Sequence, residues 1–334
     1  MKFLVIRFSS IGDIVLTSPV LRCLKQQVPD AEIHYLTKMQ FAALVEHSPY
    51  IDKVQVLGYS WELMIHQLKA EHYDAVIDLH HNLRTWRIKS ALGVQQTHSF
   101  PKLNLQKWLL TAFKINRLPE LHIVDRYLAA VAGFGVKNDG KGLEYFLPEQ
   151  NSLLETDIPL PHRFGYIGIV IGAALATKQL PMHKLQELCA GIQHPLILLG
   201  GPEDREAGDR IAAVNPVKIY NACGKFSLHE SARLVQRARI IITHDTGLMH
   251  IAAAFHKPVI SIWGNTVPAF GMTPYYGNEK VWQQMLEVPG LSCRPCSKIG
   301  YRSCPKKHFR CMEQQDLTQV FQALKEQVHA QVTI

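Results

Sequence analysis

The sequence contains no hydrophobic run long enough to cross a membrane. Its longest apolar runs, 164–175 and 251–255, are shorter than the roughly 20 residues of a spanning helix. Features of a secretory signal are also missing, because Arg7 interrupts the first hydrophobic run early. We therefore expect a cytoplasmic protein, and we interpret its seven cysteines as thiols or metal ligands in preference to disulfides.

Two glycine-rich phosphate-binding motifs are absent. No Gly-x-Gly-x-x-Gly follows the first predicted strand, which argues against a nicotinamide or flavin dehydrogenase. No Gly-x₄-Gly-Lys-Ser/Thr loop is present, which argues against a P-loop kinase or ATPase. A nucleotide ligand would have to bind through other loops.

Acidic residues are absent from two stretches of this chain, whose net charge is +8. Residues 84–117 contain seven Lys or Arg and residues 288–312 contain six, with no Asp or Glu in either. Such stretches favour an anionic partner, either a phosphorylated glycolipid, a membrane surface or nucleic acid, over a merely solvated basic face. We expect no nucleic-acid partner, because the basic runs lack regularly interleaved aromatic residues.

The 334 residues exceed what one hydrophobic core usually supports, and short β-branched runs alternate with helix-period segments. This pattern predicts two doubly wound α/β domains with parallel sheets. The predicted strands are 2–8, 32–36, 53–57, 75–79, 165–171, 195–199, 240–243 and 258–263. The predicted helices are 121–134, 182–191, 203–214, 228–237, 246–255 and 316–332, and Ser18 is a predicted helix cap.

Prolines accumulate over 148–161, which we interpret as a linker. The predicted domains are 1–150, which binds the acceptor and carries the catalytic loop, and 151–315, which binds a nucleotide sugar. A C-terminal helix follows at 316–334, with the alternative that it crosses back to the first domain. We expect a cleft along the carboxyl ends of both sheets, where open α/β sheets bind ligands.

The most informative segment of the second half is a hydrophobic strand that ends at Asp245, followed by Thr246 and Gly247 at a helix start. The start of a helix presents unpaired N–H groups and partial positive charge, which favours phosphate. Thr246 adds a hydroxyl donor, and His250 follows one turn later. The alternative is that Asp245 only caps the helix and Gly247 only allows packing.

Two other loops are predicted to reach the same sheet edge. Lys178 follows the strand 165–171 and is placed to contact a diphosphate. Glu203 follows the strand 195–199 and is placed to accept hydrogen bonds from ribose hydroxyls. Together the three loops predict a nucleotide-diphosphate site.

The first strand is followed by Ser9-Ser10-Ile11-Gly12-Asp13. A carboxylate there can take the proton of an attacking acceptor hydroxyl, although an Asp at a helix start can also be a simple cap. A second loop, 78–82, ends another strand with polar groups suited to a sugar. Its adjacent histidines, His80 and His81, point to opposite faces and make a poor metal site.

In combination, the segments 9–19, 78–84 and 245–254 resemble glycosyltransferase family 9, the ADP-heptose:lipopolysaccharide heptosyltransferases. The resemblance extends from Lys2 to about Met312. It implies a GT-B fold and inverting, metal-independent transfer of heptose from ADP-heptose, without a cofactor, to the Kdo/heptose–lipid A inner core. It also implies an enzyme peripheral to the cytoplasmic face of the inner membrane, where an anionic glycolipid is the partner.

The resemblance implies that Asp13 is the catalytic base and that Lys178 neutralises the diphosphate. The predicted nucleotide-sugar contacts are Ser9, Ser10, Gly12, Thr177, Glu203, Leu228, Asp245, Thr246, Gly247 and His250. The predicted acceptor contacts are His80, Asn82, Arg84, Arg87 and Lys89. One departure is that Gln179 follows the lysine where family members carry a nearby Trp, so different heptose contacts are expected.

Four cysteines form the pattern Cys293-x₂-Cys296-x₇-Cys304-x₆-Cys311. The first pair has zinc-knuckle spacing, but the second pair is too widely spaced for the usual zinc ribbon. We therefore favour free thiols or a disulfide and predict no metal, with a structural zinc site as the alternative.

Three other functions remain as alternatives. Two are enzymes: a GT-B transferase that uses another nucleotide sugar and glycan acceptor, and a sugar-nucleotide epimerase. The third is a non-catalytic protein that binds nucleotide or anionic lipid. The sequence does not predict the oligomeric state.

Overall fold

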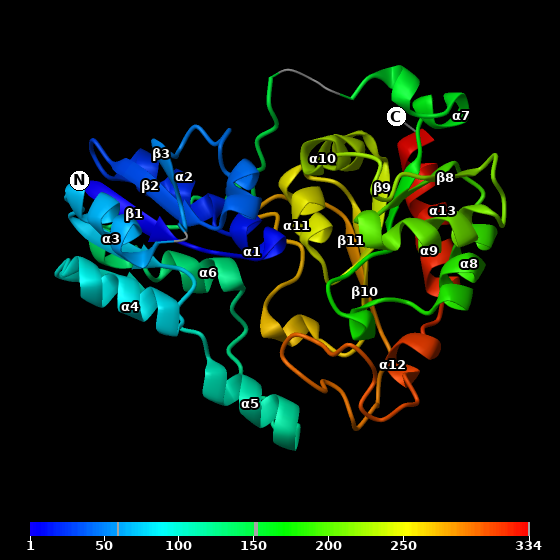
Figure 1. Cartoon of the computed structure of the whole chain (residues 1–334). Coiled ribbons are helices and arrows are strands. Elements are labelled where there is room, and N and C mark those ends of the chain that lie inside the picture. Colours follow the sequence, from blue (N-terminus) through cyan, green and yellow to red (C-terminus); the bar gives the residue numbers. More distant parts are fainter. Residues whose placement is uncertain (59, 150–152, 333–334) are drawn as a thin grey trace. The chain divides into compact units, whose positions relative to one another are not determined.

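The computed structural model describes residues 1–58, 60–149 and 153–332, with side chains up to residue 327. These form two compact units (Figure 1). Unit 1 comprises Met1–Asn104, Pro119–Leu147 and Tyr275–Glu279, and unit 2 comprises Leu105–Leu118, Pro148–Pro274 and Lys280–Ile334. The predicted linker lies partly outside the described residues, and the predicted domain boundaries stay a prediction.

Unit 1 contains a five-stranded parallel sheet in the order β3-β2-β1-β4-β5. Its central strand β1 has an uninterrupted buried run, as expected when helices cover both faces of a parallel sheet. The chain builds the sheet on one side of β1 and then on the other, so a topological switch point lies between β1 and β4. The strands are β1 (Lys2–Ile6), β2 (Glu32–Thr37), β3 (Lys53–Val56), β4 (Ala75–Asp78) and β5 (Gln96–Ser99).

Two of the helix features predicted for unit 1 differ from the structure. The single helix predicted over 121–134 is wrong: α6 ends at Leu128, and a separate 3-10 turn ends at Phe134. The next residue, Gly135, adopts a left-handed φ of 79°. The predicted cap Ser18 is instead the first residue of α2, and Thr17 occupies the cap position. Pro19 fits there because first-turn N–H groups have no partner within the helix. The helices are α1 (Ile11–Val15), α2 (Ser18–Gln27), η1 (Met39–Leu44), α3 (Trp61–Ala70), α4 (Leu83–Leu92), α6 (Ile123–Leu128) and η2 (Ala132–Phe134).

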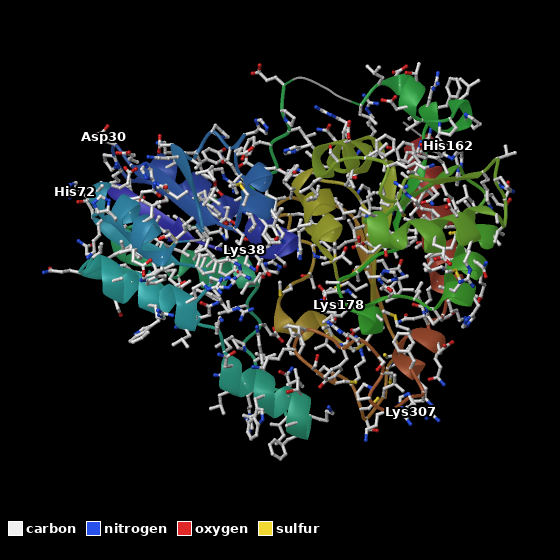
Figure 2. All side chains as sticks on the ribbon, viewed as in Figure 1. Asp30, Lys38, His72, His162, Lys178 and Lys307 are labelled. Atoms are coloured by element: carbon white, nitrogen blue, oxygen red, sulfur yellow. The ribbon has the colours of Figure 1, made fainter. Side chains whose placement is uncertain are left out.

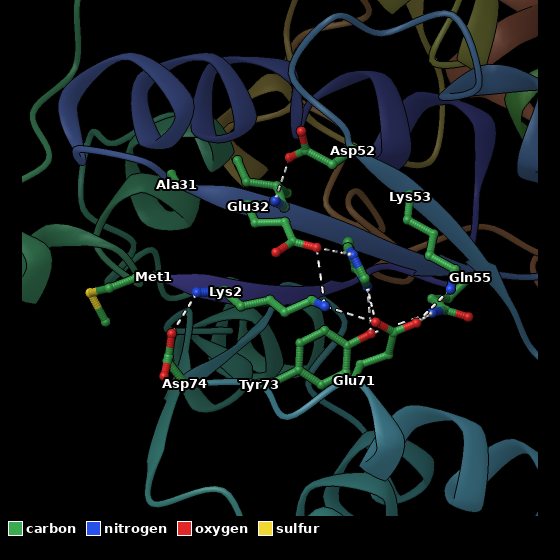
Figure 3. A network of polar contacts seen from close by, with 12 residues as sticks. Met1, Lys2, Ala31, Glu32, Asp52, Lys53, Gln55, Glu71, Tyr73 and Asp74 are labelled. Atoms are coloured by element: carbon green, nitrogen blue, oxygen red, sulfur yellow. Dashed lines mark hydrogen bonds and ion pairs between the residues drawn. The ribbon is translucent and has the colours of Figure 1, made fainter.

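A network of charged groups joins the amino ends of the unit 1 strands (Figure 3). The Lys2 ammonium contacts Glu32 at 3.1 Å and Glu71 at 2.8 Å, and His34 bonds to Tyr73 at 2.9 Å. Hydrogen bonds from Lys2 and Lys53 lower the pKa of Glu71 to about 2. Because ligands of such sheets bind at the carboxyl ends of the strands, this network is structural.

Unit 2 contains a six-stranded parallel sheet in the order β11-β10-β9-β6-β7-β8. Its switch point lies between β6 and β9, since the chain extends the sheet past β7 before it returns to β9. The strands are β6 (Ile167–Val170), β7 (Leu196–Leu199), β8 (Ile219–Asn221), β9 (Ile240–His244), β10 (Val259–Trp263) and β11 (Gln283–Glu287).

The C-terminal helix α13 contributes to the core of unit 2, where Val320 and Leu324 are buried together with Leu317, the residue before the helix. Among the described residues, no helix is long and apolar enough to cross a membrane. The helices in this part of the chain are α5 (Asn104–Phe113), α7 (Leu160–Arg163), α8 (Met182–Gly191), α9 (Arg205–Ala212), α10 (Leu228–Arg237), α11 (Gly247–Ala254), α12 (Arg310–Glu313) and α13 (Thr318–Val332). The 3-10 turns are η3 (Glu155–Asp157), η4 (Ala176–Lys178), η5 (Pro202–Asp204) and η6 (Pro268–Phe270).

Candidate active site

The carboxylate of Asp13 is held from both sides at the end of β1. Its Oδ1 lies 2.7 Å from Nη2 of Arg7, and its Oδ2 accepts a hydrogen bond from the Ser10 hydroxyl at 2.8 Å. Ser10 is the N-cap of α1 and Asp13 lies in the first turn, which includes the Gly12 backbone. The alternative of Asp13 as the cap residue is therefore wrong, although it takes part in a capping box.

Arg7 is a site residue that the sequence analysis missed. Its side chain is buried and donates to the carbonyls of Ser9 at 2.7 Å and Leu79 at 2.5 Å. Its guanidinium also lies 5.8 Å from the ring centre of Tyr127. Arg7 thus joins the loops that follow β1 and β4, on either side of the switch point. A charged residue directly after the apolar run 3–6 was the available signal.

The loop after β4 is ordered by the buried side chain of Asp78. Its Oδ1 accepts from the backbone N–H groups of His80 at 3.1 Å and His81 at 2.6 Å. Its Oδ2 lies 3.0 Å from the Lys89 ammonium, which also donates to Ser99 at 2.8 Å. Lys89 is therefore directed into unit 1, and its predicted contact with an acceptor stays a prediction.

His80 lies beside the Asp13 loop, with its ring 4.9 Å from that of Phe8. Burial, reinforced by the positive charges of Arg7 and Lys102, lowers the pKa of His80 to about 4. The imidazole is therefore neutral near pH 7. Within the described part of the chain its buried Nδ1 has no hydrogen-bond partner.

The remaining predicted acceptor residues lie on or before α4. The side-chain Oδ1 of Asn82 caps this helix by accepting from the Thr85 N–H at 2.9 Å. Arg84 is exposed, and the Arg87 guanidinium lies 4.8 Å from the ring centre of Trp61. No contact in the structure assigns these residues to an acceptor.

In unit 2, the loops after β6 and β9 meet at the switch point. The Lys178 ammonium, labelled in Figure 2, lies 2.6 Å from Oδ2 of Asp245 and 3.3 Å from its backbone carbonyl. The Thr266 hydroxyl donates to the same Oδ2 at 2.9 Å. The three side chains are mostly buried, so a cation is fixed at the edge where the sequence predicted a diphosphate.

The start of α11 adjoins this pair in the chain. Thr246 is the N-cap in extended conformation, and its side chain makes no capping hydrogen bond. Its hydroxyl lies 3.3 Å from that of Thr243. The helix begins at Gly247, and His250 is buried in its first turns. The first-turn N–H groups can therefore bind an anion, as predicted from the sequence.

The cysteine-containing loop, residues 291–311, is attached to this site. The Thr177 hydroxyl accepts from the Tyr301 N–H at 2.7 Å and donates to the Tyr301 carbonyl at 3.1 Å. Arg294 donates to the Thr266 carbonyl at 2.9 Å. Thr177 and Thr266 are therefore positioned by this loop, and the Thr177 hydroxyl is committed to it.

Glu203 and Leu228 follow β7 and β8 on the same edge of the sheet. Glu203 is exposed in η5, and Leu228 is the half-buried first residue of α10. The neighbouring Asp204 was not among the predicted site residues, and its Oδ2 accepts from the Gly201 N–H at 2.9 Å. Burial raises the pKa of Asp204, and a Cβ atom at Gly172 would overlap its carboxylate. Gly172, close after the end of β6, was the signal in the sequence for this close approach of Asp204.

All seven cysteines are free thiols. Burial raises the pKa of Cys311 to about 12, and burial together with neighbouring Cys293 and Cys304 raises the pKa of Cys296. Cys293 Sγ lies 3.8 Å from Nε2 of His308. Within the described ranges, no group of three or more His, Cys, Asp or Glu side chains is arranged to hold a metal ion.

The family model of glycosyltransferase family 9 (heptosyltransferase) matches residues 61–301 of this chain. The chain belongs to glycosyltransferase family 9. It is 26% identical over 294 residues to lipopolysaccharide heptosyltransferase 2 of Salmonella typhimurium, covering 81% of this chain and 84% of the relative. It is 28% identical over 302 residues to lipopolysaccharide heptosyltransferase 1 of Campylobacter coli, covering 83% and 86%.

Solved structures show the same fold for this family 9 glycosyltransferase. A family 9 glycosyltransferase from Veillonella parvula superposes with a TM-score of 0.76 at 22% identity, covering 98% of this chain and 97% of that one. The Escherichia coli heptosyltransferase WaaC with ADP gives 0.68 at 21% identity, covering 98% and 100%. The predicted family and the predicted GT-B fold of two parallel-sheet α/β domains are confirmed. The individual roles predicted for the site residues stay predictions.

Proposed function

We propose that this family 9 glycosyltransferase transfers heptose from ADP-heptose to a lipopolysaccharide inner-core acceptor. The observation that carries the proposal is the meeting of Lys178, Asp245 and the start of α11 at the unit 2 switch point. This arrangement combines a fixed cation with unpaired backbone N–H groups, which suits a nucleoside diphosphate. The relatives named as lipopolysaccharide heptosyltransferases and the related structure with ADP support the choice of donor and acceptor.

In the proposed reaction, the Asp13 carboxylate takes the proton of an acceptor hydroxyl as that hydroxyl attacks the anomeric carbon. The bond from that carbon to the diphosphate breaks, and ADP leaves with the electron pair. Lys178 and the N–H groups of α11 stabilise the negative charge that develops on the diphosphate. We assign inversion of configuration to direct attack opposite the leaving group, with no metal or cofactor required.

The proposed acceptor is an anionic glycolipid at the inner face of the inner membrane, which this enzyme reaches as a peripheral protein. Support comes from the names of the relatives and from the acid-free basic stretch 84–117, which includes exposed Arg84. Charge reversal of Arg84 and Arg87, with Lys89 unchanged to keep its Asp78 contact, tests this acceptor assignment. Normal binding of acceptor-containing liposomes by that variant would contradict it.

A thermal-shift panel of nucleotides and nucleotide sugars tests the donor. At about 100 times its dissociation constant, a ligand of the folded protein adds about 2.7 kcal/mol to the free energy of unfolding. We expect ADP and ADP-heptose to raise the melting temperature more than UDP, GDP or their sugar derivatives. A preference for UDP would instead favour a transferase that uses another nucleotide sugar.

Arg7 provides a further test, because we assign it the positioning of Asp13 rather than a contact with substrate. We expect Arg7→Lys to retain more turnover than Arg7→Met, because lysine keeps the positive charge beside Asp13. Both variants lose the guanidinium hydrogen bonds to the carbonyls of Ser9 and Leu79. Both variants should bind ADP with wild-type affinity, measured by calorimetry. A parallel loss of ADP affinity and turnover would assign Arg7 to general folding instead.

A further inference from the structure

Helix α5 (Asn104–Phe113) leaves most of its large apolar side chains exposed, although Leu110 is buried. Lys107, Leu110 and Lys114, spaced as one helical face, are directed toward the rest of unit 2. The Lys107 ammonium lies 6.0 Å from the ring centre of Phe270, and Lys114 donates to the Pro295 carbonyl at 2.8 Å. The cationic side of the helix is therefore the one held by the protein.

Large apolar side chains are left on the outside of α5 and just beyond its end. The exposed fractions are 64% for Leu105, 48% for Trp108, 58% for Phe113 and 47% for Ile115. The rings of Trp108 and Phe113 contact each other edge to face at 5.0 Å, yet both remain exposed. A surface helix normally directs its apolar face inward, so a contiguous apolar outer face indicates a binding surface.

The charges around this face favour one kind of partner. Lys102 precedes α5 and Arg117 follows it, while no Asp or Glu occurs from 84 to 117. Pairing with a second copy of the same helix would bring these like charges together, which is unfavourable. A bilayer that contains anionic lipids supplies both the opposite charge and an apolar layer.

We propose that the outer face of α5, with Leu105, Trp108, Phe113 and Ile115, inserts into the interfacial layer of an anionic membrane. The helix has ten residues, about half the length that would span a bilayer, so it lies in the interface. Tryptophan and phenylalanine are suited to this layer, and the flanking Lys and Arg contact lipid phosphates. This inference names the membrane contact of the proposed function and rests on it for its biological meaning.

Co-sedimentation of the full chain with vesicles tests the inference without any donor or acceptor. We expect binding to vesicles of phosphatidylglycerol and phosphatidylethanolamine, and little binding to phosphatidylcholine alone. The double variant Trp108→Ser/Phe113→Ser should bind the anionic vesicles with an affinity lower by about tenfold or more, because it removes most of the inserted apolar area. Phe164→Ser is the matched control: Phe164 is also an aromatic of unit 2, is 77% exposed and lies outside the acid-free stretch.

Quenching of tryptophan fluorescence by brominated lipids gives a second readout. We expect wild-type fluorescence to be quenched by anionic vesicles and the quenching to fall strongly in Trp108→Phe, which keeps an apolar ring but removes the reporter. Equal vesicle binding by wild type and the double variant would overturn the inference. Self-association that the double variant abolishes, without vesicle binding, would overturn it in favour of a second copy of the chain.

The two proposals fail separately. Loss of vesicle binding in wild type leaves the response to ADP in the thermal-shift panel unaffected, and that response tests the donor site alone. The double variant should keep the wild-type melting temperature, because its replaced side chains are largely exposed.

Discussion

Asp13→Ala is expected to lower kcat by about 10²–10⁴-fold while the affinity for ADP stays near that of the wild type. The expected loss follows from removal of the carboxylate that we propose takes the acceptor proton. ADP affinity should persist because the residues proposed to bind the diphosphate belong to unit 2, whereas Asp13 belongs to unit 1. Initial rates of ADP release with saturating acceptor measure the first quantity, and calorimetry measures the second.

Two further variants separate chemistry from folding at this position. Asp13→Asn keeps the size of the side chain and an oxygen for the Ser10 contact, but it has no basic carboxylate. It should therefore be as slow as the alanine variant. Glu62→Ala is the control, since Glu62 is also an acid in the first turn of a unit 1 helix. Turnover near wild type in Asp13→Asn would remove Asp13 from the role of base.

Lys178→Met is expected to lower kcat by about 10²–10³-fold and to weaken ADP binding as well. The lysine is the fixed cation at the switch point, and the leaving diphosphate gains negative charge in the transition state. Steady-state rates and calorimetric ADP titrations measure the two effects. Lys184→Met is the control in the same unit, because Lys184 forms an ion pair with Glu187 along helix α8.

The ion pair with Asp245 makes a sharper test possible. Lys178→Met alone leaves a largely buried carboxylate without its cation, which itself destabilises the loop. Adding Asp245→Asn removes that charge and should restore the melting temperature. If Lys178 acts on the diphosphate, the double variant stays slow although it is stable. Recovery of turnover along with stability would mean that Lys178 serves only to neutralise Asp245.

The sequence predicts the central strands of both sheets well, because strands buried on two faces need continuous apolar runs such as 3–6 and 240–242. It does not reveal β5, since this edge strand, Gln96–Ser99, is short, polar and partly exposed. Helices α3 and α4 are also missed. Large apolar residues lie on both the buried and the exposed sides of these helices, so the helical periodicity of the sequence is weak there.

The candidate site is predicted at the level of sheet edges and not of atoms. Strand order places Lys178 and Asp245 on one edge, but only the fold shows that they form an ion pair. Arg7 escapes notice because its partners, the carbonyls of Ser9 and Leu79, come from loops far apart in the chain. The exposure of the apolar face of α5 could not be predicted, because helical periodicity alone predicts that such a face is buried.

The ion pair between Lys178 and Asp245 has a consequence for ligand discrimination. An arriving anion must compete with a carboxylate already 2.6 Å from the ammonium, so occupancy of the site is a counter-ion exchange. In the proposed site, inorganic phosphate or sulfate would gain only the helix N–H contacts, whereas a nucleoside diphosphate would also gain contacts through its nucleoside. In the proposed site, Asp245 therefore competes with every entering anion for the Lys178 ammonium.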